Sequence, residues 1–317
     1  MSPLDSAPPQ VLVMGGGGVL GEAWMSALLA GIAAGGGFDG REAGAWIGTS
    51  AGSIVAASLA VGVDPAERLE VDRADLNAGG QAGSTERRRG PFSGPLAAAL
   101  QAGGAAAAPL ASFALSSSAG GGAMLRRAML RRVPPGERSL GELGRMIDAA
   151  GVQFDGRLRI ATVELGSGRR VMFGAPGAPP CSVAQAVLAS CAIPGVFAPV
   201  AIDGRDYVDG GAWSPTNMDA AEVERGDRVL CLNPTGSLRP TVAAPAGAIG
   251  PISRSLSNGE ALALRHRGAK VRTINPDPAS SRVMGINLMD PNKRGAVIAA
   301  GHAQGLRLAG RSGKRAA

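Results

Sequence analysis

The pentapeptide G-T-S-A-G at residues 48–52 is the part of this sequence best suited to chemistry. It follows a short apolar strand predicted over residues 43–47 and precedes a predicted helix. A serine in a G-x-S-x-G pattern lies on a sharp turn between strand and helix, with its hydroxyl exposed at the carboxyl edge of a sheet. Gly48 and Gly52 give the backbone the freedom that such a turn needs. The pattern therefore predicts that Ser50 is a nucleophile for acyl transfer.

A run of glycines follows the first predicted strand, at residues 11–14, and precedes a predicted helix. Its members Gly16, Gly17 and Gly18 lack side chains, so successive backbone N–H groups can face a reacting carbonyl oxygen. Acyl transfer needs such donors because negative charge develops on that oxygen in the transition state. We expect these N–H groups to form an oxyanion hole, together with that of Ala51 at the start of the helix after the nucleophile.

The base is harder to place, because the chain holds only two histidines, His266 and His302. Both lie in stretches expected at the surface. Asp209 is the better candidate, since it follows a short apolar strand and opens a turn at Gly210 and Gly211. From there its carboxylate can approach a serine at the end of a neighbouring strand. A carboxylate of ordinary pKa is a weak base, so the site must exclude water or raise that pKa.

Alternating strand and helix patterns predict an α/β fold. Strand, helix, strand and helix follow one another at the start of the chain, which is typical of a parallel sheet with helices on its faces. A later pair of strands flanks the turn G-S-G at residues 166–168. The predicted elements are strands at 11–14, 43–47, 158–165, 170–173, 228–232 and 270–274, and helices at 22–34, 54–61, 183–190 and 291–308.

The predicted domain boundaries lie where the alternation of strand and helix patterns stops. We expect a flexible N-terminal tail over 1–10, a single catalytic domain over 11–310 and a basic C-terminal tail over 311–317. Residues 64–140 are predicted to be an inserted lid or cap, with a loosely ordered surface insertion as the alternative. Within it, the stretch 90–125 carries no charged residue. Its repeated Gly and Pro and its poor hydrophobicity argue against a membrane span.

Composition restricts the partners. The chain has 317 residues and a formal net charge of +7, which favours anionic partners, although a basic surface without a partner is the alternative. Aromatic residues make up only 3%, so the chain lacks the aromatic and basic pattern of a nucleic-acid stacking platform. Three cysteines without a paired pattern argue against a disulfide scaffold or a structural zinc site. The first ten residues lack a cationic start and an apolar core, so we expect a cytoplasmic protein.

A basic segment after the uncharged stretch suggests contact with a membrane. It contains Arg126, Arg127, Arg131 and Arg132, and the pair Arg127 and Arg131 lies four residues apart on one helical face. A basic amphipathic helix can lie on an anionic membrane surface. A solvated helix face is the alternative.

Four blocks in a fixed order give the chain a resemblance to the patatin-like phospholipases, which are lipid acyl hydrolases. The first block is the glycine run, read as G-G-G-V-L-G over 16–21, and the second is the pentapeptide at 48–52. The third is A-S-C-A-I-P-G-V-F-A-P-V over 189–200, and the fourth is D-G-G over 209–211. Each block alone is weak evidence for the resemblance, but the four blocks together in this order are specific for the family.

The resemblance implies a three-layer α/β sandwich with a mainly parallel central sheet and helices on both faces. It also implies a Ser50–Asp209 dyad that cleaves carboxylic esters of lipids through an acyl-enzyme, with no cofactor and no metal. One residue departs from the family pattern: a cation usually precedes the last glycine of the first block, where this chain has Leu20. That departure leaves the strength of catalysis open.

Other classes of function fit parts of the pattern. An α/β-hydrolase triad of Ser50, Asp209 and His266 has the right chain order, but too few strands precede the serine. The spacing of Gly16, Gly18 and Gly21 matches a dinucleotide fingerprint, yet no acidic residue ends the second strand. A patatin-like protein that binds lipid without turnover is the third alternative, which Leu20 keeps open.

Overall fold

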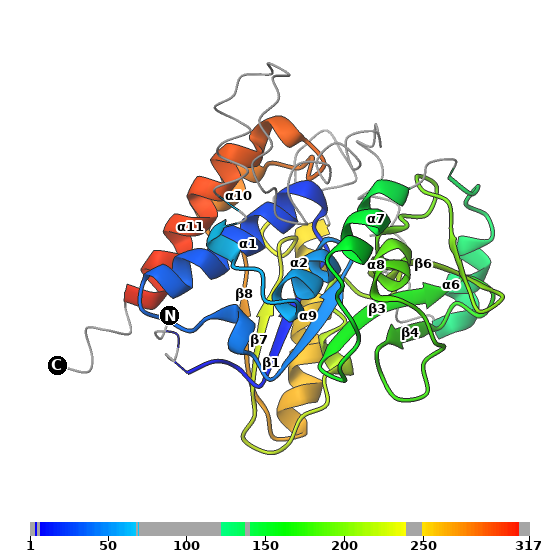
Figure 1. Cartoon of the computed structure of the whole chain (residues 1–317), viewed down its shortest axis with the longest axis horizontal. Helices are drawn as coiled ribbons and strands as arrows, with labels where there is room; N and C mark the ends of the chain where they lie inside the picture. The colour runs from blue at the N-terminus through cyan, green and yellow to red at the C-terminus, as the bar shows by residue number, and fades with distance from the viewer. Residues whose placement is uncertain are drawn as a thin grey trace.

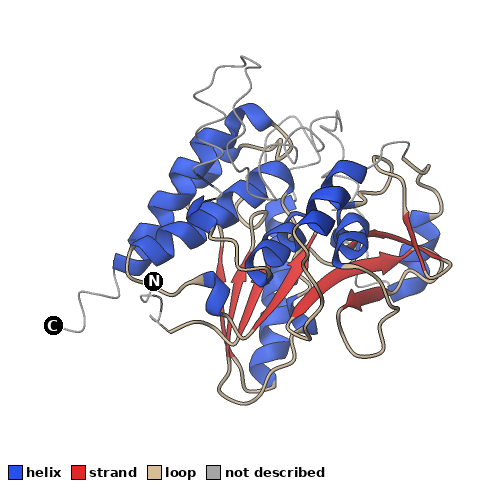
Figure 2. Ribbon diagram, viewed as in Figure 1, coloured by secondary structure: helices blue, strands red, loops and turns tan. Residues whose placement is uncertain are grey.

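An eight-stranded mixed sheet forms the centre of the structure (Figure 2). The computed structural model describes residues 4, 7–67, 69, 122–136, 140–238 and 249–310. In that part of the chain the strand order is β5-β6-β3-β2-β1-β7-β8, and β4 pairs with β3. The strands are β1 (Val11–Met14), β2 (Ala45–Thr49), β3 (Leu158–Glu164), β4 (Arg170–Phe173), β5 (Val200–Ile202), β6 (Arg205–Asp209), β7 (Arg228–Leu232) and β8 (Lys270–Ile274).

Helices cover both faces of this sheet, so the predicted α/β sandwich with a largely parallel sheet is confirmed (Figure 1). Strand β1 shows how the two layers of core arise, since its side chains alternate between the faces. Leu12 and Met14 belong to the large core that includes α1, α2 and α8, whereas Val11 and Val13 pack in the core beneath α9. The helices are α1 (Gly18–Ala34), α2 (Ala51–Ala60), α6 (Gly122–Leu130), α7 (Gly141–Ala149), α8 (Val183–Cys191), α9 (Ile249–His266), α10 (Pro278–Met284) and α11 (Arg294–Gly310).

Helix α1 is buried on all sides because α11 lies against its outer face (Figure 1). A helix that is apolar all round needs such cover. The two helices approach closely at glycines: a Cβ on Gly31 would overlap the carbonyl oxygen of His302, and one on Gly305 would overlap that of Leu28. The C-terminal helix thereby holds the helix that follows the glycine run.

Most of the predicted strands have the predicted bounds, and the differences lie near the candidate site. Helix α1 starts at Gly18 rather than residue 22, and α2 starts at Ala51 rather than residue 54. Strand β2 covers Ala45–Thr49 rather than 43–47, because Gly44 still bonds to the carbonyl oxygen of Pro9. Both helices therefore begin directly beside the residues expected to do the chemistry.

The predicted flexible tail over 1–10 is wrong for residues 7–10. Pro9 is buried, and its carbonyl oxygen accepts the Gly44 N–H at 3.2 Å. The carbonyl oxygen of Pro8 accepts a hydrogen bond from Arg228 at 2.7 Å. These residues are thus part of the packed domain.

The predicted lid over 64–140 and the basic tail over 311–317 lie largely outside the described residues. Of the lid, α6 is described, and its Leu130 packs with Val163 and Val208 of the sheet. Of the helices that the structure describes, none is both long and apolar enough to cross a membrane.

Candidate active site

Ser50 occupies a sharp turn between β2 and α2. Its φ of 51° and ψ of −125° place it in a region that residues with a side chain rarely adopt. Two hydrogen bonds hold the turn: the Ser50 N–H donates to Ser190 Oγ at 2.8 Å, and Ser190 Oγ donates to the carbonyl oxygen of Ala161 at 2.7 Å. Gly52 is required for space, since a Cβ there would overlap the carbonyl oxygen of Met14. Strain that the surroundings maintain in this way is typical of functional sites.

Asp209 is brought to Ser50 by the pairing of three strands. Thr49 of β2 pairs with Ala161 of β3, and the next residue of β3, Thr162, pairs with Asp209 at the end of β6. The Asp209 side chain accepts the Gly211 N–H at 2.7 Å, and the Ser50 side chain lies near enough to lower the pKa of its carboxyl. The structure therefore brings together the two side chains expected to form the dyad.

Burial changes the acidity of Asp209. The residue is only 2% exposed, against 9% for Ser50. This burial raises the pKa of the Asp209 carboxyl from 3.8 to about 7, although the hydrogen bonds from Ser50 and Gly211 oppose the rise. A carboxylate with a pKa near neutrality is a competent general base at neutral pH.

The glycine run offers two of the three expected donors. The Gly16 N–H donates to the carbonyl oxygen of Pro215 at 2.8 Å, so the prediction that it faces a reacting oxygen is wrong for this structure. The N–H groups of Gly17, Gly18 and Ala51 have no acceptor among the described residues. Gly17 and Gly18 border the same pocket as Ser50.

A small pocket joins these groups. Its volume is about 60 Å³, and Ser50, Asp209 and Gly211 line it together with Gly17 and Gly18. Ile193, Leu288 and Met289 form an apolar wall. Pockets that enclose a ligand usually measure about 300–1,000 Å³, so this one holds a reacting group and little more. It lies beyond the carboxyl ends of β1, β2 and β7. The chain order of the sheet changes direction between β1 and β7, and ligands of α/β folds usually bind beside such a point.

Two residues that were not predicted from the sequence hold the loops of the site in place by hydrogen bonds. Asn217 Nδ2 donates to Thr49 Oγ1 at 3.1 Å and to the carbonyl oxygen of Gly210 at 3.2 Å, which ties the turn of the serine to the turn of the aspartate. Glu260 of α9 accepts the Met218 N–H at 3.0 Å and so anchors the same loop. No spacing in the sequence could have identified them, because each acts across a long stretch of chain.

Leu20 stands where the family pattern has a cation, and the structure shows which residues surround this position. Leu20 is fully buried, and its N–H donates to the carbonyl oxygen of Leu288. A cation reaches this turn from the other end of the chain: Arg294 Nη1 of α11 lies 2.6 Å from Glu22 Oε2 and 3.3 Å from the carbonyl oxygen of Val19. The first turn of α1 therefore has a cationic neighbour although residue 20 is apolar.

Replacing Arg294 with methionine is expected to lower the free energy of unfolding by about 3–5 kcal/mol, because the fully buried Glu22 side chain would lose this cationic partner. Arg307 lies on the same helix and pairs with Asp277, but its side chain is 54% exposed. Arg307→Met should therefore cost at most about 1 kcal/mol. Urea unfolding measures both changes.

The double variant Glu22→Leu, Arg294→Met provides the second check. It should be more stable than Arg294→Met alone, because it removes the buried charge along with its partner. Equal losses for Arg294→Met and Arg307→Met would contradict the importance of this pair.

The remaining predicted site residues lie elsewhere. His266 is exposed at the end of α9, just before the amino end of β8, whereas Ser50 follows the carboxyl end of β2. Since β2, β1, β7 and β8 are parallel, His266 lies at the opposite edge of the sheet, and the triad alternative is wrong for this structure. In the part of the chain that is described, no group of three His, Cys, Asp or Glu residues is placed to hold a metal.

The basic segment is not uniform. Arg127, Arg131 and Arg132 are exposed, as expected for a surface face. Arg126 is instead fully buried: it donates to the carbonyl oxygens of Ala212 and Gly168, and its guanidinium stacks on Trp213 at 4.1 Å. The expectation that Arg126 contacts a membrane is therefore wrong, because tertiary packing places it inside.

Solved structures and a family model are similar to this chain. Two similar solved structures are VipD from Legionella pneumophila, at 19% identity and a TM-score of 0.45, and the type III effector protein ExoU, at 16% and 0.36. The alignments cover 96% and 98% of this chain, but only 67% of the VipD chain and 54% of the ExoU chain. None of the curated proteins compared with the chain matches it. The model of the patatin-like phospholipase family matches residues 12–222, more than half of the chain. The chain belongs to the patatin-like phospholipase family of lipid acyl hydrolases.

Proposed function

We propose that this protein cleaves carboxylic esters of lipids with Ser50 as the nucleophile and Asp209 as the general base. One observation carries the proposal: a buried carboxyl, with its pKa raised to about 7, lines the same pocket as a serine on a strained turn. A nucleophile and a base within hydrogen-bonding reach are the minimum for this chemistry.

In the first half of the reaction, Ser50 Oγ attacks the acyl carbon and its proton passes to Asp209. The N–H groups of Gly17, Gly18 and Ala51 stabilise the negative charge on the carbonyl oxygen. The tetrahedral intermediate then collapses, and the leaving alcohol takes the proton from Asp209. An acyl-enzyme on Ser50 remains.

Water completes the cycle. Asp209 accepts a proton from the water that attacks the acyl-enzyme, and the same N–H groups stabilise the second intermediate. Collapse of this intermediate releases the carboxylic acid, and the proton on Asp209 returns to Ser50 Oγ. No metal or cofactor is needed for any of these steps.

The lining of the pocket supports an apolar acyl group. Ile193, Leu288 and Met289 are close to Ser50, and no charged side chain other than Asp209 lines the described pocket. Because its volume is only about 60 Å³, an acyl chain requires the loop of Leu288 and Met289 to move. Exposed Met124 and Leu125 of α6, beside Arg127 and Arg131, support peripheral contact with an anionic membrane surface.

A fluorophosphonate probe tests the nucleophile. We expect the native protein to be labelled once, on the peptide that contains Ser50, and the heat-denatured protein not to be labelled. Labelling of another residue would contradict the assignment of Ser50. Absence of labelling would favour the alternative of a lipid-binding protein without turnover.

A substrate panel then tests the substrate class. Short nitrophenyl esters, phosphatidylcholine vesicles and anionic phospholipid vesicles should all be hydrolysed, the anionic vesicles fastest. Arg127→Gln combined with Arg131→Gln should remove only the preference for anionic vesicles. Equal rates on both kinds of vesicle would contradict membrane contact through α6.

A further inference from the structure

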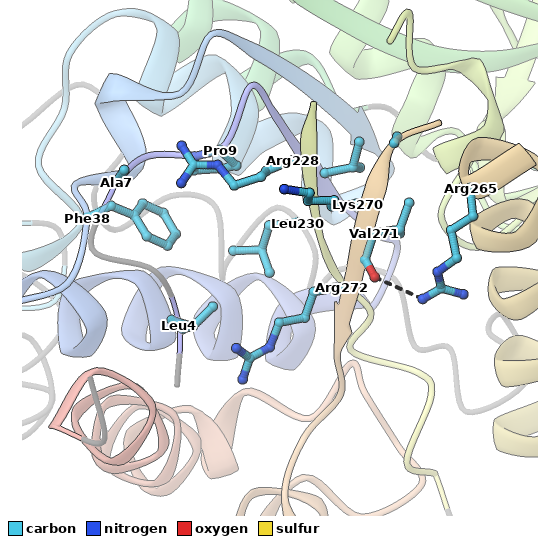
Figure 3. Close-up of a pocket in the computed structure, with 12 residues that line it drawn as sticks. Leu4, Ala7, Pro9, Phe38, Arg228, Leu230, Arg265, Lys270, Val271 and Arg272 are labelled. Carbon is cyan, nitrogen blue, oxygen red and sulfur yellow. Dashed lines mark hydrogen bonds between the residues drawn. The ribbon is translucent and has the colours of Figure 1, made fainter. Parts of the chain in front are cut away.

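The pocket at Ser50, of about 60 Å³, has no room for the acyl chain of a lipid. A larger cavity, of about 370 Å³, lies at the amino ends of β7 and β8, where Phe38 and Leu230 are among its lining residues (Figure 3). Ser50 follows the carboxyl end of β2, and β2, β1 and β7 are parallel, so this cavity is at the opposite edge of the sheet. Space for a chain attached to the reacting carbon must therefore come from the residues that line the pocket itself.

Two of the three apolar residues in the wall of the pocket are held in place. The carbonyl oxygen of Ile193 accepts the N–H groups of Val196 and Phe197, both at 3.1 Å, and its β-branched side chain is stiff. The carbonyl oxygen of Leu288 accepts the Leu20 N–H at 2.9 Å, and the Leu288 side chain packs in the large core. Neither residue can leave the pocket without losing these contacts.

Met289 is the third residue of this wall, and its side chain can rotate while its backbone stays fixed. Its N–H donates to Asn287 Oδ1 at 3.1 Å, and its unbranched side chain has three rotatable bonds. The Met289 Sδ atom lies against Gly18, since a Cβ on that glycine would be only 2.7 Å from it. Gly18 carries one of the N–H groups assigned to the oxyanion hole. Rotation of this one side chain would therefore enlarge the pocket beside the reacting carbon.

The chemistry of the wall indicates which half of the ester enters this space. Ile193, Leu288 and Met289 present apolar side chains to the pocket. The alcohol half of a membrane lipid carries a polar head group, which would lose its hydration against such a wall. The acyl half is a run of methylene groups, and the burial of each one is favourable. The wall therefore fits the acyl chain.

We propose that Met289 is the specificity-determining residue for the acyl chain. In the position seen here, its side chain limits the pocket to a short acyl group, and rotation away from Gly18 admits a longer, unbranched chain. Ordinary core packing is the simpler explanation for a buried methionine, and it predicts no effect of this residue on chain-length preference. The proposed role depends on ester cleavage at Ser50, as proposed above.

Two nitrophenyl esters with the same leaving group, the butyrate and the octanoate, measure the preference as a ratio of kcat/KM values. One methylene that an apolar pocket accepts or rejects changes kcat/KM by roughly 10–200-fold. Met289→Ala should therefore raise the ratio of octanoate to butyrate by about tenfold or more. Met289→Leu conserves volume but has a branched side chain with well-defined rotamers, so it should lower the ratio by a similar factor.

Ile286→Ala provides the matched control. Ile286 lies in the same loop as Met289, but it is 48% exposed and is not among the described residues that line the pocket. Its replacement should leave the ratio unchanged. Thermal unfolding checks that each variant is folded.

Binding of a product tests the same space without turnover. Calorimetry measures octanoate binding to Ser50→Ala and to Ser50→Ala combined with Met289→Ala. At pH 6 the Asp209 carboxyl, with a pKa of about 7, is largely protonated and does not repel the ligand. We expect the double variant to bind octanoate about ten times more tightly or better, because the chain gains the space of the methionine.

The outcomes separate this role from the proposed reaction. If the wild type hydrolyses the esters and both Met289 variants keep its ratio, the role of Met289 is overturned and ester hydrolysis stands. An equal change of the ratio in Ile286→Ala also overturns it, because the loop as a whole would then set the preference. If the wild type hydrolyses neither ester, the proposed function fails, and octanoate binding still decides: equal affinities with and without Met289→Ala overturn the role.

Discussion

Replacing Asp209 with asparagine is expected to lower kcat for ester hydrolysis by about 10²–10⁴-fold, with a small change in KM. Asparagine has nearly the same shape and can still accept the Gly211 N–H, but it cannot take a proton from Ser50. Asp206 provides the control, because it lies on the same strand with an exposed side chain. Asp206→Asn should keep full activity.

The pH profile should identify Asp209 as the base. Since burial raises its pKa to about 7, the wild-type kcat should increase with pH and reach a plateau above about pH 7. Residual activity of Asp209→Asn should lack this step. A wild-type rate that falls with rising pH across this range, or full activity of the variant, would contradict the dyad.

The same shift should make the stability of the protein depend on pH. The pKa is about 7 in the folded protein and about 4 in the unfolded chain, so between these values the native state holds a proton that the unfolded state lacks. The free energy of unfolding should therefore fall as pH rises through this window. Asp209→Asn should reduce that fall and be more stable than wild type at pH 8, as urea unfolding can show.

Replacing Ser50 with glycine is expected to lower kcat by more than about 10⁴-fold, because the nucleophile is lost. The same change should stabilise the protein by roughly 1 kcal/mol. A residue held at this positive φ costs about 1–3 kcal/mol, and glycine offsets part of that gain through its greater freedom when unfolded.

Ser50→Ala separates the two effects. It also removes the hydroxyl, but it keeps a Cβ at the strained position, so it should be as inactive as Ser50→Gly and less stable. Asp203 also has a positive φ, of 49°, on an exposed turn, and Asp203→Gly should leave activity unchanged. Equal stability of Ser50→Gly and Ser50→Ala would contradict strain at the turn.

The sequence predicted many of the strands near the site, but it did not predict helix α9, which packs on one face of the sheet. Strands such as β1 and β7 were predicted with the observed bounds, because short apolar runs next to glycines are a local signal. Helix α9 was not predicted, since its buried face carries Ser253 and Ser257 where an apolar stripe would be expected. Both serines are bonded to Asn233, a partner that no local pattern reveals.

Sequence alone determined the family and the elements that carry the chemistry: a glycine run, a serine turn and an aspartate turn, each set by backbone freedom and by the strand beside it. Tertiary structure alone decided which groups are available. The Gly16 N–H donates a hydrogen bond to the carbonyl oxygen of Pro215, and Arg126 is buried. Packing also brings Arg294 to the first turn of α1 and excludes water from Asp209. The physical reason is that burial and hydrogen-bond partners depend on contacts between segments far apart in the chain, which local patterns do not encode.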